Sequence, residues 1–167
     1  MKEINIIDFG LMGKQISALF YLLGYEIGVY NKSKLNIYEF EKQIKLLQRK
    51  IDFSNFNAGK INIYQHIEDL KNSLTIESLN EDLNLKKEIM QILRDNNIVF
   101  SNSSSLSMDD LNCDFIHFFN TIYIKLIELC GSNLERFTPL KDLKKLGFHI
   151  ICSKGNRGAL ANLLLFN

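Results

Sequence analysis

The chain has 167 residues, of which 46% are hydrophobic and 23% are charged, and its formal net charge is +1. These values indicate one globular domain with a core of ordinary size, and they exclude a disordered chain. The small net charge gives no reason to expect nucleic acid or an anionic membrane as a general partner.

The amino terminus has no apolar signal region, and no apolar run approaches the ~20 residues that are needed to span a bilayer. We therefore expect a cytoplasmic protein. The three cysteines, Cys113, Cys130 and Cys152, are scattered and each lies in an apolar setting. This pattern predicts buried reduced thiols rather than a disulfide. No spacing typical of metal ligands is present, so no metal site is predicted.

Strands and helices alternate from the start of the chain. A strand at 3–8, a glycine turn, a helix at 15–23 that ends at Gly24, and a strand at 26–30 form one compact unit. Further strands are predicted at 60–64, 74–78, 98–101, 115–119, 123–129 and 148–152, and helices at 34–51, 66–72, 83–95, 134–146 and from 158 onward. This alternation predicts a single α/β domain over 1–156, a Rossmann-like doubly wound and largely parallel sheet with helices on both faces.

The first unit carries the sequence Asp8-Phe9-Gly10-Leu11-Met12-Gly13. Dinucleotide-binding folds place glycine at the first, third and sixth of these positions. Gly10 would let the backbone approach a pyrophosphate, and Gly13 would let the helix pack closely on the strand. Asp8 replaces the first glycine, and its charge should weaken pyrophosphate binding by about a few kcal/mol in a poorly solvated site. The alternative is an inherited turn whose nucleotide site has decayed.

The end of the second strand also departs from the dinucleotide pattern. An acidic residue is expected there to bind the adenosine ribose, but the strand ends in Asn31, followed by Lys32 and Ser33. Asparagine can still hydrogen-bond a ribose hydroxyl, and Lys32 with Ser33 can receive a 2′-phosphate. The predicted cofactor is therefore NAD or NADP, and both Asp8 and Asn31 are expected to weaken its binding.

A second group of polar residues follows later in the chain. His117 lies in an apolar run, and Glu128 lies in the next run that also has the pattern of a strand. Antiparallel neighbours would bring the two together, so that the carboxylate sets the orientation and charge of the imidazole. The hydroxyl-rich segment 101–105 follows a predicted strand, where open α/β sheets bind ligands. The alternatives are a core histidine and an ordinary strand-to-loop turn.

With these residues, the chain resembles the amino-terminal domain of the 3-hydroxyacyl-CoA dehydrogenases, including the 3-hydroxybutyryl-CoA dehydrogenases. Residues 10–13 resemble the glycine turn of the family, and residues 74–93 resemble its Val-Glu-Ala-Ile…Glu-Asn-Leu…Lys segment. Residues 101–106 are similar to Ser-Asn-Thr-Ser-Ser-Leu, and 115–128 are similar to His-Phe-Phe-Asn-Pro…Lys-Leu-Val-Glu. The order and separation of the last three segments make the resemblance specific.

The resemblance implies a role for each matching residue. His117 would be the general base that takes the hydroxyl proton as hydride leaves C3 of a 3-hydroxyacyl thioester, and Glu128 would orient it. Ser104 would hydrogen-bond the reacting oxygen, and Asn162 matches the active-site asparagine of the family. Cofactor contacts are implied for Gly10, Leu11, Met12, Gly13, Asn31, Lys32, Glu81 and Lys86.

The chain also departs from the family pattern. Thr121 replaces the proline after His-Phe-Phe-Asn, and the loop that leads to Glu128 is one residue shorter. This shortening would shift Glu128 relative to His117. Family members continue into an all-helical carboxy-terminal domain that forms the dimer and completes the acyl-CoA cleft, and residues 157–167 match the start of the helix that leads there.

The resemblance therefore implies a 3-hydroxyacyl-CoA dehydrogenase activity that is incomplete without that helical domain. Without it, the last helix would expose apolar side chains, so we expect a homo-oligomer or a separate helical-domain partner. The alternative is a non-catalytic Rossmann-fold module (a pseudoenzyme) that binds a partner protein or, weakly, a nucleotide.

Overall fold

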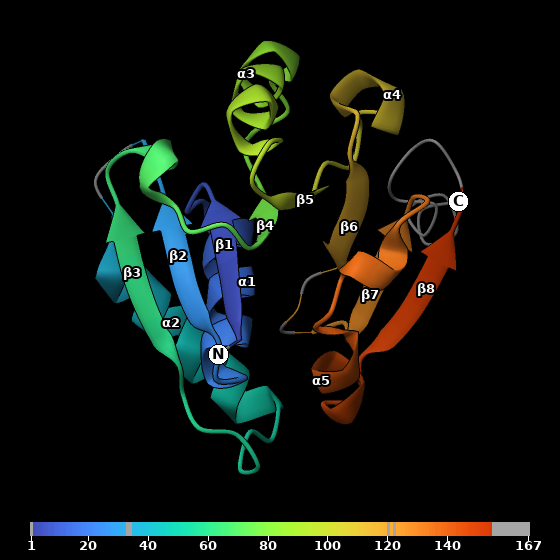
Figure 1. Cartoon of the computed structure of the whole chain (residues 1–167). Coiled ribbons are helices and arrows are strands. Elements are labelled where there is room, and N and C mark those ends of the chain that lie inside the picture. Colours follow the sequence, from blue (N-terminus) through green and yellow to red (C-terminus); the bar gives the residue numbers. More distant parts are fainter. Residues whose placement is uncertain (1, 33–34, 120, 122, 155–167) are drawn as a thin grey trace.

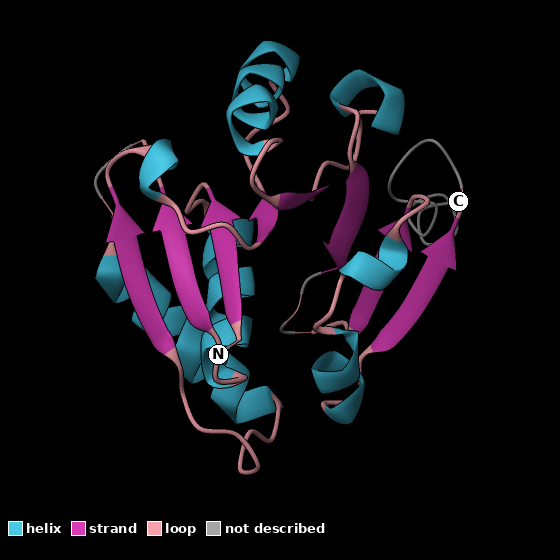
Figure 2. Ribbon diagram, viewed as in Figure 1, coloured by secondary structure: helices cyan, strands magenta, loops and turns pink. Residues whose placement is uncertain are grey.

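The computed structural model describes residues 2–32, 35–119, 121 and 123–154, in which one sheet has the strand order β3-β2-β1-β4-β5-β6-β7-β8. The predicted α/β class is confirmed, with helices on both faces of the sheet (Figures 1 and 2). The strands are β1 Glu3–Ile7, β2 Glu26–Tyr30, β3 Lys60–Tyr64, β4 Leu74–Glu77, β5 Ile98–Ser101, β6 Asp114–Phe119, β7 Leu126–Cys130 and β8 His149–Ser153. The helices are α1 Leu11–Leu22, α2 Ile37–Lys50, α3 Leu83–Leu93, α4 Met108–Leu111 and α5 Leu140–Lys145, with 3₁₀ turns η1 Ile67–Asp69 and η2 Leu134–Arg136.

Strand direction divides the sheet into two parts. The six strands from β3 to β6 are parallel, β7 is antiparallel to β6, and β8 is parallel to β7. The carboxyl ends of β1, β4 and β5 therefore share one edge, which is where ligands bind in open α/β sheets.

Neighbouring residues of β1 explain how both faces are covered. Ile4 and Ile6 are buried in the cluster that contains α1 and α2, whereas Ile7 packs with Ile89 and Leu93 of α3. Side chains alternate across a strand, so each face of β1 has its own helix layer. α5 adds Leu143 to the first cluster.

Several predicted elements differ in extent from the observed ones. The helix expected at 134–146 is split into η2 and α5, because Pro139 cannot donate a backbone hydrogen bond and restricts the residue before it. The helix expected at 66–72 is a single 3₁₀ turn, and α4 was not predicted. A capping box formed by Ser107 and Asp110 stabilises α4. The helix expected from 158 lies outside the described residues.

The cysteines are only partly as predicted. All three are free, but Cys130 is buried, Cys113 is half-buried and Cys152 is exposed on β8. The prediction was wrong for Cys152 because β8 is an edge strand, which leaves part of its side chains uncovered. Burial raises the pKa of the Cys113 thiol to about 12, so this thiol stays protonated.

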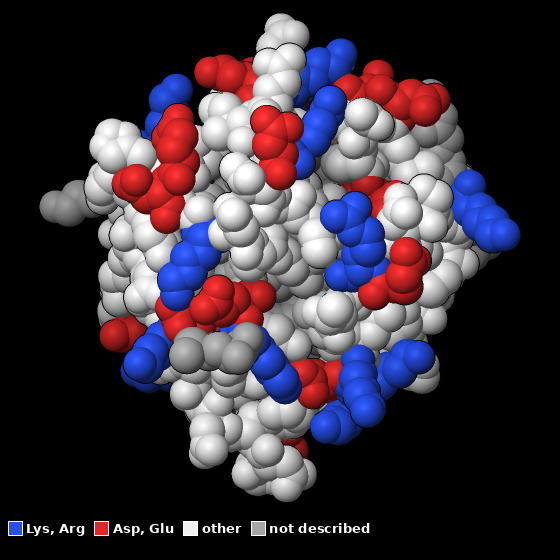
Figure 3. All heavy atoms as spheres, viewed as in Figure 1, with Lys and Arg blue, Asp and Glu red and all other residues white. Residues whose placement is uncertain are grey.

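The surface carries charges of both signs in close mixture. Figure 3 shows Lys and Arg side chains alternating with Asp and Glu over the face in view, as the net charge of +1 leads one to expect. In the described ranges, no helix combines the length and apolarity that a membrane span requires.

We predict that Gly13→Ala destabilises the fold by about 1–3 kcal/mol, the usual cost of overpacking. A Cβ atom at Gly13 would collide with the main-chain oxygen of Asp8, because α1 approaches the end of β1 closely there. Urea unfolding measures the change. The neighbouring variant Lys14→Ala serves as the control and should stay within about 0.5 kcal/mol of the wild type. An equal stability for Gly13→Ala would show that this close approach is not a constraint.

Candidate functional site

A pocket of about 380 Å³ opens at the carboxyl ends of the central parallel strands. Its walls come from the turn after β1, the loop after β4, the serine-rich loop after β5, and His117 and Phe118 of β6. Six residues that the sequence predicted for the site line this one pocket, namely Gly10, Leu11, Met12, Glu81, Ser104 and His117. The fold thus brings the predicted nucleotide turn and the predicted base together.

His117 and Glu128 are direct partners across the β6–β7 ladder. The antiparallel arrangement expected from the sequence is therefore confirmed, and the shorter loop does not move Glu128 out of register with His117. Thr121, which replaces the family's proline, is fully buried and its hydroxyl lies 3.4 Å from Oε1 of Gln15 on α1. Glu128 is 1% exposed and accepts a hydrogen bond from Ser153 Oγ at 3.1 Å.

The surroundings of His117 favour its neutral form. Burial lowers the pKa of the imidazole below its ordinary value of 6.5, while the charge of Glu128, the main chain of Ser103 and the charge of Glu81 act in the opposite direction. Its ring packs on Phe119 with 4.4 Å between the centroids. Among the described residues, none hydrogen-bonds the buried Nδ1 atom. A neutral imidazole in this position can accept a proton at physiological pH.

Glu81 holds the serine-rich loop against the loop after β4. Its carboxylate accepts hydrogen bonds from Ser103 Oγ at 2.6 Å and from the Ser104 amide at 2.9 Å. Burial alone would raise the pKa of Glu81, but these hydrogen bonds outweigh burial and lower it. Ser104 itself is exposed, and its hydroxyl lies 3.4 Å from Glu81, so the contact is weak and the hydroxyl can turn to a ligand.

The Asp8 side chain makes a hydrogen bond within the glycine turn. Asp8 has a φ angle of +76°, in the left-handed region that favours glycine, and its Oδ2 atom accepts a hydrogen bond from the Gly10 amide at 2.9 Å. The carboxylate thus occupies an amide that a pyrophosphate would use. Asn31 also binds the turn, because its Oδ1 atom accepts a hydrogen bond from the Phe9 amide at 3.0 Å.

The remaining predicted residues lie away from the pocket surface or outside the described chain. Lys86 is fully buried and is not among the described residues that line the pocket, so its cofactor contact stays a prediction. Lys32 is exposed just after β2. Gly13 packs beneath the turn. Asn162 and Ser33 lie outside the described residues.

Sequence reasoning assigned no role to Glu77, and it noted Ser101 and Asn102 only as part of the hydroxyl-rich segment 101–105. Glu77 and Ser101 are fully buried at the ends of β4 and β5, and Asn102 Oδ1 accepts a hydrogen bond from the Phe118 amide at 3.1 Å. A signal was present in the sequence. Lys86 falls on the apolar stripe of α3, with Ile89 and Leu93, and a charge at such a position indicates a buried partner.

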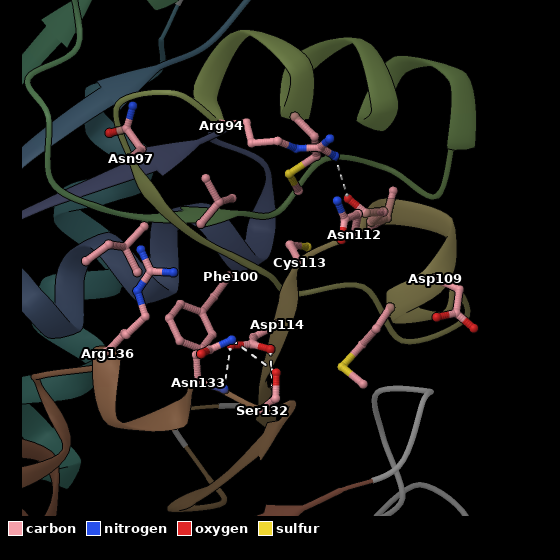
Figure 4. Close-up of a pocket in the computed structure, with 15 residues that line it drawn as sticks. Arg94, Asn97, Phe100, Asp109, Asn112, Cys113, Asp114, Ser132, Asn133 and Arg136 are labelled. Carbon is pink, nitrogen blue, oxygen red and sulfur yellow. Dashed lines mark hydrogen bonds between the residues drawn. The ribbon is translucent and has the colours of Figure 1, made fainter.

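A second hollow of about 310 Å³ lies between α3, α4 and the start of β6. Figure 4 shows Arg94 and Arg136 on its walls together with Asp109 and Asp114, so charges of both signs balance there. Arg94 donates to the Leu111 carbonyl at 3.4 Å. None of the residues predicted for the site lines this hollow. The described residues also contain no group of three or more side chains placed to hold a metal ion.

Comparisons with known proteins show the family of this chain. A family model described as "3-hydroxyacyl-CoA dehydrogenase, NAD binding domain" matches residues 3–144. A 3-hydroxybutyryl-CoA dehydrogenase from Clostridioides difficile is 27% identical over 157 residues, which cover 79% of this chain and 55% of the relative. The chain thus spans about half the length of that relative.

Two solved structures illustrate the likeness in fold. FadB2 of M. tuberculosis superposes with a TM-score of 0.76 at 20% identity, over 99% of this chain and 69% of that protein. The (S)-3-hydroxybutyryl-CoA dehydrogenase PaaH1 from Ralstonia eutropha gives a TM-score of 0.75 at 20% identity, over 98% and 68% of the two chains. At such identities, the likeness establishes the fold.

We predict that His117 makes stability depend on pH. Its pKa is depressed in the fold, so its contribution is complete above the unfolded value of 6.5 and is lost as the pH falls toward the folded value. Urea unfolding between about pH 5 and pH 7.5 should show this loss for the wild type and a smaller loss for His117→Gln. The control is His66→Gln, at an exposed position, which should keep the wild-type slope. Equal slopes for the wild type and His117→Gln would contradict the prediction.

Proposed function

Because the chain belongs to the family of 3-hydroxyacyl-CoA dehydrogenase NAD binding domains, we propose that it is the cofactor-binding half of an oxidoreductase of that type. The reaction is a reversible hydride transfer between C3 of a 3-hydroxyacyl-CoA and NAD or NADP. One observation carries the proposal. The glycine turn, Ser104 and His117 line a single pocket, and Glu128 faces His117 across the neighbouring strand.

The shape of the turn fits a dinucleotide. α1 begins directly after Gly10 and has no acidic residue in its first turn, so the positive end of its dipole faces the turn. A Cβ atom at Gly10 would lie 2.8 Å from the Asp8 carboxylate, so the absence of a side chain keeps this approach open. Asp8 is the residue of the turn that opposes an anion.

The positions of three side chains support the catalytic roles that we propose. The nicotinamide ring, when bound, supplies the hydride acceptor or donor. His117, kept neutral by burial, accepts the proton of the substrate hydroxyl. Glu128 lies opposite and stabilises the imidazolium that forms, because its charge partly offsets the lowering of the His117 pKa by burial. The Ser104 hydroxyl donates a hydrogen bond to the reacting oxygen.

The acyl-CoA side of the site is proposed to come from an all-helical domain, on a further part of the protein or on a partner chain. Two facts support this. The chain aligns with 55% of the Clostridioides difficile dehydrogenase, and Ser104 stands exposed at the rim of the pocket. Asn162 would then join Ser104 and His117 at the substrate.

A non-catalytic binding module is the second candidate function. The Asp8 carboxylate favours it, since Oδ2 already occupies the Gly10 amide at 2.9 Å. In addition, the described residues that line the pocket include two carboxylates, Asp8 and Glu81, but no lysine or arginine. A dinucleotide would therefore meet negative charge at both positions.

We predict that Asp8→Gly strengthens NADH binding by about tenfold or more, which is about 1.4 kcal/mol. The substitution removes a charge, frees the Gly10 amide and places glycine where φ is +76°. Calorimetric titration with NADH and NADPH measures both affinities. Asp95→Asn, at an exposed position beyond α3, is the control and should bind as the wild type does. If neither the wild type nor Asp8→Gly binds either nucleotide, the dehydrogenase proposal is rejected in favour of the module.

The same titrations address the choice between NAD and NADP. Lys32, exposed just after β2, is proposed to receive the 2′-phosphate of NADP, because a cation near this strand end suits that group. Lys32→Ala, prepared in the Asp8→Gly background, should weaken NADPH binding and leave NADH binding unchanged. An equal effect on both nucleotides would exclude this role.

A further inference from the structure

A fully buried ion pair lies beneath the pocket. Lys86 Nζ is 2.7 Å from Glu77 Oε1, and both side chains are 0% exposed. The other ion pairs in the described part of the chain each have at least one half-exposed side chain. Burying both charges costs several kcal/mol in desolvation, and apolar replacements of such pairs are often neutral or stabilising. Stability alone therefore explains this pair poorly.

The hydrogen bonds of the pair connect it to the loops after β4 and β5. Lys86 Nζ donates to the Leu79 carbonyl at 2.9 Å, and the Leu79 amide donates to Glu77 Oε1. The pair thereby fixes the first residues after β4. On the other side, Ser101 Oγ donates to Glu77 Oε2 at 2.6 Å, and the Ser103 amide donates to Ser101 Oγ at 3.2 Å. The same carboxylate thus anchors the loop after β5.

These two loops are the walls that carry Glu81 and Ser104. Glu81 joins them again at the rim through Ser103 and Ser104, whereas Glu77 and Lys86 join them at the base. The loops also border His117, because the main chain of Ser103 and the charge of Glu81 both act on its imidazole. A change at the base would therefore reach the imidazole through the loops.

We propose that Glu77 and Lys86 are positioning residues of the candidate site. The buried pair locks the loops after β4 and β5 together, which keeps Ser104 at the rim and limits the exposure of His117. Neither residue contacts the pocket directly, since Glu77 and Lys86 are absent from its described lining. The inference concerns the same site as the proposed function, but its first readout requires no cofactor.

The test compares three variants with the wild type. The double variant Glu77→Leu/Lys86→Met replaces the pair by apolar side chains. Ser101→Ala keeps the pair and removes only the hydroxyl between Glu77 and the Ser103 amide. Glu39→Gln is the matched control, because it breaks an exposed ion pair, Lys42 Nζ to Glu39 Oε1 at 2.9 Å, that is remote from the pocket lining.

The first readout is the NMR titration of the His117 ring in the protein without cofactor, and circular dichroism verifies folding. Loosened loops admit water, which removes the main cause of the lowered pKa. The titration midpoint should therefore rise toward 6.5 in the double variant, rise less in Ser101→Ala and stay unchanged in Glu39→Gln. The second readout is NADH affinity, which should fall by about tenfold in the double variant, or about 1.4 kcal/mol.

The outcomes separate positioning from a purely structural role. A folded double variant with the wild-type His117 midpoint would overturn the proposal. If the double variant does not fold, Ser101→Ala decides, since an unchanged midpoint in that folded variant overturns the proposal and a raised one supports it. A raised midpoint together with no NADH binding by the wild type would support the positioning role while rejecting the proposed function.

Discussion

The candidate site depends on the antiparallel pairing of β6 with β7. The other strands beside the pocket run parallel and contribute loops at their ends, whereas this pairing places two side chains opposite each other within the sheet. A shift of one residue would turn the partner of His117 to the opposite face. The buried Thr121, near Gln15 of α1, ties the connection between the strands to the core and so supports this register.

Three carboxylates surround the site, and their hydrogen bonds give each a different effect. Glu128 is buried behind His117 and favours its protonated form, which a general base requires after it accepts a proton. Glu81 is occupied by amide and hydroxyl donors of the serine-rich loop, so its main effect is to hold that loop. Asp8 accepts from the Gly10 amide and thereby competes with an anionic ligand. In the proposed function, these contacts favour the base near Glu128 and oppose a pyrophosphate near Asp8.

Sequence reasoning recovered the fold and the facing pair because both depend on local patterns. Alternating apolar runs specify the strands, and their separation in the chain predicted that His117 meets Glu128. Sequence reasoning failed where the position of a side chain depends on tertiary packing. The burial of Lys86 depends on Glu77 and Leu79, which belong to a different element and approach only in the folded chain. Likewise, the sequence shows a carboxylate at Asp8 but not that its oxygen turns back to the Gly10 amide.

The two ends of the pocket are physically separable, and this bears on the choice between an enzyme and a module. His117 and Glu128 are held by the β6–β7 ladder, whereas Asp8 lies in the turn between β1 and α1. We therefore expect a substitution at Asp8 to change binding at the turn while His117 and Glu128 stay in place. His117 is half-buried beside the pocket, where burial opposes the protonation of its imidazole and the charge of the facing Glu128 favours it. The carboxylate of Asp8 therefore opposes the dehydrogenase proposal, whereas the pairing of His117 with Glu128 supports it.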